Sequence, residues 1–298
     1  MKRIFALLLC LLCVLSLFGC GKKKEEEKAS ESLPVMAVSS LLYHNGSTTL
    51  RFTCEDKWVW ADGPTFPLDD STITQIMEEL PKLLALEPKK GRGDLSAYGL
   101  AEPVRYLTVT GESGSQTVYF GTQAENGRWY MRLADGDGIF LIPNDFMVLL
   151  SKNIYDMAIL PTLPELTEDI VTFIGVSQSE ENNTYLLRTD EGWKTNGNNV
   201  SKTAEKIINE LGELTIARCV DYFPSNGVGE LCGLGEGATT VTVKHANSVG
   251  TESELVLTIG SEMESGEGIY ATIGGSDAIY CLTGSRLTTI LSLLKPAE

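Results

Sequence analysis

The sequence has very little of the side-chain chemistry that metal sites and His-based enzymes need. It contains two histidines, His44 and His245, in 298 residues. Neither has a second His or a Cys at metal-ligand spacing, and a catalytic triad needs a His beside a nucleophile and an acid. We therefore expect no metal site and no triad. His245 falls near the end of a predicted strand, where a surface or edge position is expected.

Motifs for nucleotide binding and for nucleophilic catalysis are also missing. The glycine-rich stretch 227–237 (GVGELCGLGEG) precedes a predicted strand, whereas a dinucleotide fingerprint precedes a helix. It lacks the Lys and hydroxyl pair of a P-loop, and the chain has no GxSxG elbow. We interpret the stretch as a turn-forming loop. The sequence thus predicts no cofactor and no catalytic residue.

Positive charge is scarce, since 24 Lys and Arg face 40 Asp and Glu, for a net charge of -16. Nucleic-acid binding needs clustered basic residues, so we expect no nucleic-acid partner. Paired acids keep one enzymatic alternative open, a cell-wall hydrolase, although solvated surface charge is the simpler interpretation. The pairs are Asp69 and Asp70, Glu78 and Glu79, Asp135 and Asp137, and Glu180 and Glu181.

Cysteines are few, and none forms a CxxC motif. Of seven, Cys10 and Cys13 lie in the N-terminal apolar stretch and Cys20 follows it. The other four predict neither a redox motif nor a zinc knuckle. A disulfide between two of them across a loop and buried free thiols both stay open. These four are Cys54, Cys219, Cys232 and Cys281.

No apolar run is long enough for a comfortable membrane span, which takes about 20 residues. The stretch 4–18 is shorter, follows Lys2 and Arg3, and ends in Leu17-Phe18-Gly19-Cys20, which resembles a bacterial lipobox. We predict a lipoprotein signal peptide at residues 1–19 and a lipidated Cys20, followed by a charged tether that ends at residue 32. Two or more acyl chains give stable anchoring. This places the protein on the extracytoplasmic face of the cell membrane.

The remaining chain contains an internal repeat. Residues 97–121 and 231–260 each hold a Gly-Leu pair, an alternating strand, a polar turn and a second strand that ends in Gly. Because Gly99 and Gly233 recur while their neighbours differ, we expect each to need positive φ or a close approach that a Cβ would block. The matched landmarks are Trp60 and Trp193, Gly99 and Gly233, Leu100 and Leu234, Gly121 and Gly260, Tyr130 and Tyr270, and Phe140 and Tyr280.

Periodicity predicts an α+β fold of two duplicated, largely antiparallel β-rich repeats, at residues 33–160 and 161–298. In each, a short amphipathic helix follows the first strands and another helix closes the repeat. In the first repeat, Thr72 and Gln75 fit a capping box and Pro81 should end or kink the helix. The aromatics Trp58, Trp60, Trp129 and Tyr130 are expected in the core or, alternatively, along a sugar or peptide groove.

The landmarks of the first repeat resemble those of the DUF4340 family. They comprise Tyr98-Gly99-Leu100 with Pro103, a strand ending in YFG at Gly121, then WYMR (129–132) and GIFLI (138–142) before a helix. The second repeat matches more loosely. The resemblance implies an extracytoplasmic, membrane-associated protein, often encoded beside ABC transporters of the kind linked to gliding motility. It supplies no catalytic residues.

These observations lead to one principal hypothesis and one alternative. The first is a lipid-anchored, non-catalytic interaction or accessory protein associated with an ABC-type transport complex, its partners being permease or auxiliary subunits. The alternative is a solute- or glycan-binding lipoprotein with a cleft between the two repeats. The lipobox, the duplicated β-rich body, the lack of catalytic groups and the family resemblance favour the first.

The anchor gives the first prediction. In Cys20→Ala the thiol that receives the lipid is gone, so labelling with a fatty-acid analogue should be lost. The precursor should then accumulate or be shed, which membrane fractionation measures. A variant that stays as firmly in the membrane as the wild type would contradict the lipobox interpretation.

Overall fold

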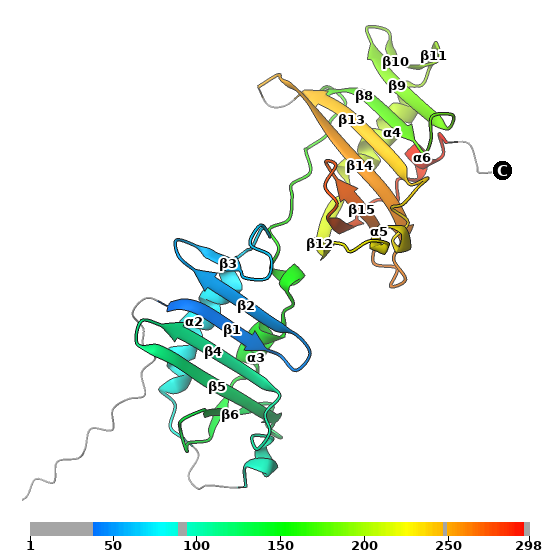
Figure 1. The fold of residues 1–298 in the computed structure, drawn as a ribbon. Helices are drawn as coiled ribbons and strands as arrows, with labels where there is room; N and C mark the ends of the chain where they lie inside the picture. The colour runs from blue at the N-terminus through cyan, green and yellow to red at the C-terminus, as the bar shows by residue number, and fades with distance from the viewer. Residues whose placement is uncertain (1–37, 89–93, 247–248, 295–298) are drawn as a thin grey trace, which may run out of the picture.

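The computed structural model describes residues 38–88, 94–246 and 249–294, which form two antiparallel β-sheets and few helices. Figure 1 shows the two sheets as separate units joined by an extended segment. We call them the first unit, residues 38–157, and the second unit, residues 171–294. The predicted β-rich, largely antiparallel architecture is confirmed.

The first unit contains a seven-stranded sheet of order β3-β2-β1-β4-β5-β6-β7. Its helices α2 and α3 pack on one face of the sheet (Figure 1). The elements are β1 Val38–His44, β2 Thr49–Cys54, β3 Trp58–Trp60, α2 Ser71–Leu84, η1 Leu95–Tyr98, β4 Arg105–Gly111, β5 Gly114–Gln123, β6 Trp129–Leu133, β7 Phe140–Ile142, α3 Asn144–Ser151 and η2 Ile154–Met157.

The second unit contains a nine-stranded sheet of order β11-β10-β9-β8-β13-β14-β15-β16-β12. One helical turn, α5, lies inside the glycine-rich stretch interpreted above as a loop. The elements are β8 Val171–Ser177, β9 Asn183–Thr189, β10 Gly192–Thr195, β11 Asn198–Asn199, α4 Ser201–Gly212, β12 Thr215–Asp221, α5 Val228–Leu231, β13 Thr239–Ala246, β14 Glu252–Glu262, β15 Ile269–Ile273, β16 Ile279–Thr283 and α6 Thr288–Leu291.

The two sheets share one strand order once β11 and β12 at the edges of the second are set aside. β1 to β3 correspond to β8 to β10, and β4 to β7 correspond to β13 to β16. The registers agree as well, because Tyr43 opposes Leu107 as Val176 opposes Val241. This agreement is consistent with two repeats, and it lets equivalent positions of the two units be compared.

Each core lies between one sheet face and its helices. In the first unit, Ile73, Ile76 and Leu80 of α2 are fully buried against the sheet, as their helical spacing predicts. In the second unit, Ile207 and Leu211 of α4 occupy the same kind of position.

Two details of α2 differ from expectation. The helix begins at Ser71, and the Asp69 carboxylate accepts the Ser71 N–H at 2.9 Å. Thr72 is buried, and its Oγ1 accepts from Lys152 Nζ at 3.0 Å, so it forms no capping box with Gln75. Of the two effects expected at Pro81, an end or a kink, the end does not occur, because the helix continues through Leu84.

His245 is 7% exposed, so the expectation of a surface or edge position is wrong. Strand β13 extends through Ala246 and lies between β8 and β14, so no edge is present there. Alternation along β13 places His245 on the same side as the buried Val241 and Val243.

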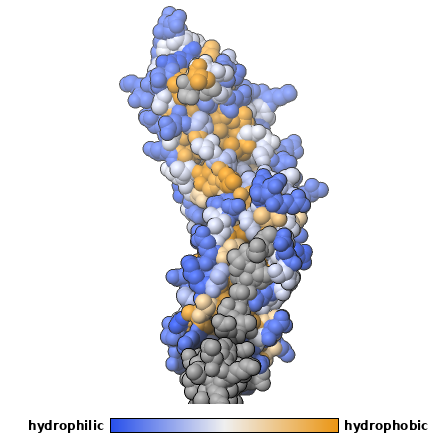
Figure 2. All heavy atoms as spheres, turned by 90° about the vertical axis from the view of Figure 1, so that its left-hand side faces the viewer, coloured by the Kyte–Doolittle hydropathy of each residue, from blue (hydrophilic) through white to orange (hydrophobic). Residues whose placement is uncertain are grey.

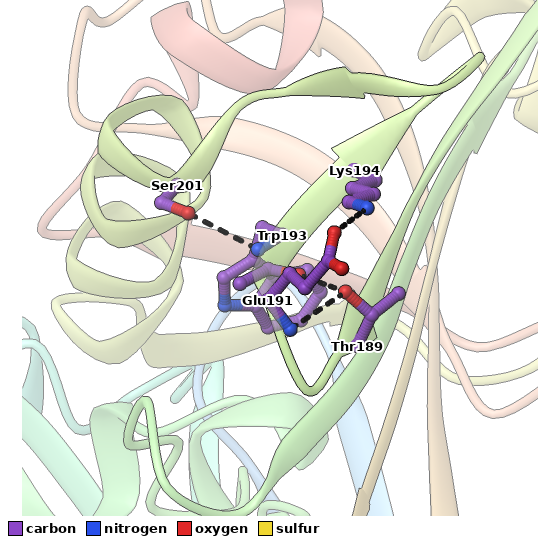
Figure 3. A network of polar contacts seen from close by, with 6 residues as sticks. Thr189, Glu191, Trp193, Lys194 and Ser201 are labelled. Carbon is purple, nitrogen blue, oxygen red and sulfur yellow. Dashed lines mark hydrogen bonds and ion pairs between the residues drawn. The ribbon is translucent and has the colours of Figure 1, made fainter.

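The paired Trp residues do not have equal burial. Trp193 is 1% exposed, whereas Trp60 is half-buried. A hydrogen bond links the hairpin of β9 and β10 to the first residue of α4 (Figure 3). The backbone N–H of Trp193 donates to Ser201 Oγ at 3.1 Å. Thr189 Oγ1 also donates to the Gly192 carbonyl at 2.7 Å, which closes the turn. The Trp193 side chain packs in the core of the second unit.

Gly99 ends η1 in the left-handed region, with φ of +66°. Its N–H donates to the Ser96 carbonyl and the Leu100 N–H donates to the Leu95 carbonyl, the pattern of a Schellman turn. The turn lies against a bulge in β5. There, a Cβ on Gly121 would come 2.0 Å from the Tyr98 carbonyl oxygen.

Gly233 occupies the same turn in the second unit, with φ of +73°. The Leu234 N–H donates to the Gly229 carbonyl at 2.8 Å. A Cβ on Gly260 would come 2.2 Å from the Cys232 carbonyl oxygen, and β14 carries a bulge at the equivalent position. We call this pairing of a left-handed turn with a glycine bulge the turn–bulge contact.

Segment 158–170 between the sheets has no helix or strand. Its first residues are held to the first unit, since the Ile159 N–H donates to the Pro67 carbonyl at 2.7 Å. Further along, Leu166 is buried in the second core. The segment is therefore anchored at both ends.

An aromatic contact joins the two units directly. Phe66 meets Tyr222 edge to face, with ring centroids 5.3 Å apart, and Trp60 lies 6.4 Å from Phe223. The Tyr155 hydroxyl donates to the Asp221 carboxylate at 2.7 Å. Burial, with this hydrogen bond and the nearby charge, raises the pKa of Tyr155 to about 12.

The turn–bulge contact predicts the effect of substituting its glycines. Gly99→Val and Gly233→Val should each lower the free energy of unfolding by more than about 1 kcal/mol, because positive φ and a close backbone neighbour both oppose a side chain. A Cβ on Gly233 would lie 2.6 Å from Ser261 N. Chemical denaturation measures the loss, which should be similar in the two variants.

Gly127→Val is the matched control. Its φ is +78°, but nothing lies within 4 Å of a Cβ there. It should therefore be less destabilising than either turn variant. Melting temperatures of both turn variants equal to the wild type would remove the structural role assigned to these glycines.

The inter-unit hydrogen bond predicts a pH effect. Tyr155→Phe should lower the free energy of unfolding by about 1–2 kcal/mol at pH 8. Because folding raises the pKa of Tyr155 from 10.0 to about 12, its contribution is full below pH 10 and is lost as the pH rises through 12. The difference between wild type and variant should therefore shrink between pH 9 and pH 11.5. A pH-independent difference would contradict this assignment.

Candidate functional site

A cavity of about 310 Å³ opens at one end of the first sheet. It lies where the β1–β2 turn, the first residues of β4 and β6, and helix α3 meet. The lining residues are His44, Asn45, Ser47, Arg105, Trp129, Met147, Leu150 and Ser151.

Strand alternation places Arg105 and Trp129 at this end of the core. Arg105 has the same phase along β4 as the buried Leu107 and Val109. Trp129 has the same phase along β6 as the buried Met131 and Leu133. Both side chains therefore extend the core-facing rows to the point where the core ends, and both are half-buried.

The Arg105 guanidinium lies over the Trp129 ring, 5.3 Å from its centroid. The β1–β2 turn reaches the same group, since a Cβ on Gly46 would be 3.6 Å from the guanidinium carbon. Trp129 is itself held in place, because its indole N–H donates to Asn144 Oδ1 at 3.0 Å. The cation thus has a defined position.

Among the described residues, Arg105 has no hydrogen-bond acceptor and no acidic partner, whereas each of the other arginines has one. Arg51, Arg218 and Arg286 pair with acids, and Arg128, Arg132 and Arg188 donate to backbone carbonyls. Arg132 is the closest comparison, because it also lies over an aromatic ring, that of Tyr119.

The remaining wall of the cavity combines polar and apolar groups. His44 Nδ1 is hydrogen-bonded to Thr49 Oγ1 at 2.9 Å, which leaves Nε2 as the other ring nitrogen. Asn45 Oδ1 accepts three bonds from Ser47 and Thr48, so its amide N–H groups stay available. Met147 and Leu150 supply a buried apolar side. The lining contains no Asp or Glu.

The equivalent end of the second unit is built differently. By register, Thr239 stands where Arg105 stands in the first unit, since they pair with Ile259 and Phe120. Ile269 stands where Trp129 does, since they pair with Glu262 and Gln123. Thr239 is 6% exposed, and its Oγ1 accepts from Gln178 Nε2 at 3.0 Å. These two polar side chains are thus hydrogen-bonded to each other. Among the described residues, a cation over an aromatic ring at this end of the core occurs in the first unit alone.

A second cavity, of about 430 Å³, also lies in the first unit and includes Arg132, Asp135 and Asp137. Its cation donates to the carbonyls of Leu100, Leu133 and Ala134. Because these partners already engage the guanidinium, this cavity offers less binding capacity to a ligand than the first.

Catalytic groups do not gather in the part of the chain that the structure describes. No group of three or more His, Cys, Asp or Glu is placed to hold a metal ion there. The four described cysteines are free thiols. Burial raises the pKa of Cys219 to about 11 and also raises the pKa of Cys232 and Cys281, which disfavours the reactive thiolate.

The outer face of the second sheet exposes aromatic and aliphatic side chains. Phe173 stacks on Tyr185 with centroids 6.2 Å apart, and Lys244 Nζ lies 5.9 Å from the Phe173 ring. Tyr185 is 49% exposed and Leu187 47%. We call Phe173, Tyr185 and Leu187 the outer aromatic patch. Figure 2 shows the molecule turned by 90° from Figure 1. On this face, apolar areas lie between hydrophilic side chains.

The residues singled out by sequence have different positions. Cys20 lies outside the described residues, and Gly99 and Gly233 form turns and do not line the cavity. Of the four aromatics considered for a groove, Trp129 lines the cavity, and Trp60 contacts the second unit. Arg105 was not among the residues singled out from the sequence. It could have been found as a charged residue at a core-facing position of the alternating strand RYLTVT (105–110).

Comparison with known proteins identifies one family. The family described as "Domain of unknown function (DUF4340)" matches residues 58–231, from β3 of the first unit to α5 of the second. Neither the curated proteins nor the solved structures contain a match to the chain. Within the described residues, no helix has the length and apolar content needed to cross a bilayer.

Proposed function

The chain belongs to the DUF4340 family, and from this premise we propose that it is a lipid-anchored extracytoplasmic accessory protein. It acts by binding, without catalysis, beside an ABC-type membrane transport complex. The Leu17-Phe18-Gly19-Cys20 sequence supports the anchor, and the charged residues that follow support a tether. Both lie outside the described residues.

We further propose that the two units are tandem copies of one ancestral domain. The shared strand order and the repeated turn–bulge contact support this. The family match takes in parts of both units, so each unit is assigned as a copy on the basis of its own topology. Duplication would leave one copy free to change its surface while the other kept the frame.

The outer aromatic patch is the observation that carries the binding role. Tyr185 and Leu187 are exposed next to the half-buried Phe173, so the patch presents apolar surface that a partner would cover. Aromatic side chains are enriched at protein interfaces, where they supply large contact areas. The occupant we assign is a permease or auxiliary subunit of the transport complex.

Affinity capture from detergent-solubilised membranes tests this role. The wild type should recover transporter subunits, and the double variant Tyr185→Ser, Leu187→Ser should recover several-fold less. Leu231→Ser is the matched control, since Leu231 is 85% exposed in the same unit but lies away from the patch. Recovery of unrelated proteins only, or equal recovery by both variants, would contradict the proposal.

The cavity around Arg105 favours a second function, the binding of a small solute. The cleft expected from sequence was between the repeats, whereas this cavity lies within the first unit. A thermal-shift screen with sugars, peptides and small acids tests it. A ligand at 100 times its dissociation constant should stabilise the protein by about 2.7 kcal/mol. A screen without any stabilising compound would count against solute binding.

A further inference from the structure

We propose that the cavity of the first unit is a binding site for a small organic carboxylate, whose head pairs with Arg105 and whose apolar part lies against Met147 and Leu150. This deepens the second proposed function and rests on it. The guanidinium left unpaired among the described residues, the composition of the wall and the contrast with the second unit support it.

The Arg105 guanidinium is the group with unused binding capacity. It carries five N–H donors in a planar fork that matches a carboxylate. Within the described residues no carbonyl or carboxylate takes any of them, although the other arginines each have such a partner. The chain has 40 Asp and Glu residues, yet none of the described ones pairs with the half-buried Arg105. Its N–H donors are therefore available to an anionic ligand.

The cation lies against a supported aromatic ring. The Trp129 ring supports one side of the guanidinium, and Asn144 holds that ring through its indole N–H. Less side-chain freedom is therefore lost when an anion binds. A fork held in this way favours a bidentate contact over a diffuse charge interaction.

The wall of the cavity selects the rest of the ligand. Met147 and Leu150 are 7% and 3% exposed and present apolar surface next to the cation. The volume of about 310 Å³ is at the small end of ligand pockets. Because the lining has no Asp or Glu, a carboxylate meets no like charge. The Asn45 amide offers a further donor.

Other ligand classes fit these groups less well. A sugar would use the face of an aromatic ring, but Arg105 covers the face of Trp129 that it lies over. A phosphate would gain nothing from the apolar side formed by Met147 and Leu150. A cation is repelled by Arg105. A monocarboxylate with a short branched hydrocarbon body satisfies both sides of the wall.

Isothermal titration of the purified full-length chain tests the proposal, with N-acetyl-L-leucine as the probe. The acid should bind with one site per chain, and its affinity should fall with rising salt. N-acetyl-L-leucine amide has the same body without the charge and should bind at least tenfold more weakly. Acetate has the head without the body and should also bind at least tenfold more weakly.

Variants separate the site from general charge effects. Arg105→Gln should weaken binding of the acid at least tenfold. Arg51→Gln makes the same charge change at an exposed ion pair of the first unit and should leave the affinity within twofold. Circular dichroism and the melting temperature should show both variants folded.

Three results would overturn the proposal: equal affinity for acid and amide, unchanged affinity in Arg105→Gln, or absence of binding by the acid at 10 mM. Phosphate binding that exceeds carboxylate binding and depends on Arg105 would overturn the carboxylate assignment as well. If the solute screen finds a neutral ligand while the acid fails, only the ligand class is wrong. If no compound binds, the solute-binding function fails with it.

Discussion

The close approach of a turn carbonyl to a glycine in the neighbouring bulged strand is the constraint on which both units depend. The Tyr98 carbonyl meets Gly121 and the Cys232 carbonyl meets Gly260, at distances that leave no room for a Cβ. The left-handed glycine of each turn makes this approach sterically accessible, and the Leu that follows packs on the bulge glycine. This contact ties the turn that precedes β4 to the bulge of β5, and the turn that precedes β13 to the bulge of β14.

Because both units share the turn–bulge contact, the residues at the ends of their cores can differ without a change of strand order. In the second unit, Thr239 and Gln178 satisfy each other at the end of β13. In the first unit the equivalent position is Arg105, which rests on Trp129 beside a cavity. The same strand order thus supports one closed core end and one that offers a cation to a ligand, while the outer aromatic patch lies on the second sheet. The proposed binding functions are thereby divided between the two units.

Local patterns in the sequence predicted the strands and the two glycine turns, but the capping box of Thr72 and Gln75 was wrong. Alternation predicted the strands, and the recurrence of Gly99 and Gly233 predicted turns, because both signals act within a few residues. Contacts between distant segments were not accessible in this way. The Tyr155–Asp221 bond, the burial of His245 on an interior strand and the cavity at Arg105 each depend on which strands become neighbours, and the lipid anchor stays a prediction.

Hydrogen exchange of Gly121→Ala and Gly260→Ala tests the central claim most directly, since each variant adds one methyl group at the turn–bulge contact. Amide protection, followed by mass spectrometry, should fall in the unit that carries the substitution, to a similar extent in the two variants. The other unit should keep most of its protection. A variant with wild-type protection, or a large loss for one glycine beside none for the other, would contradict the claim that both units rest on the same contact.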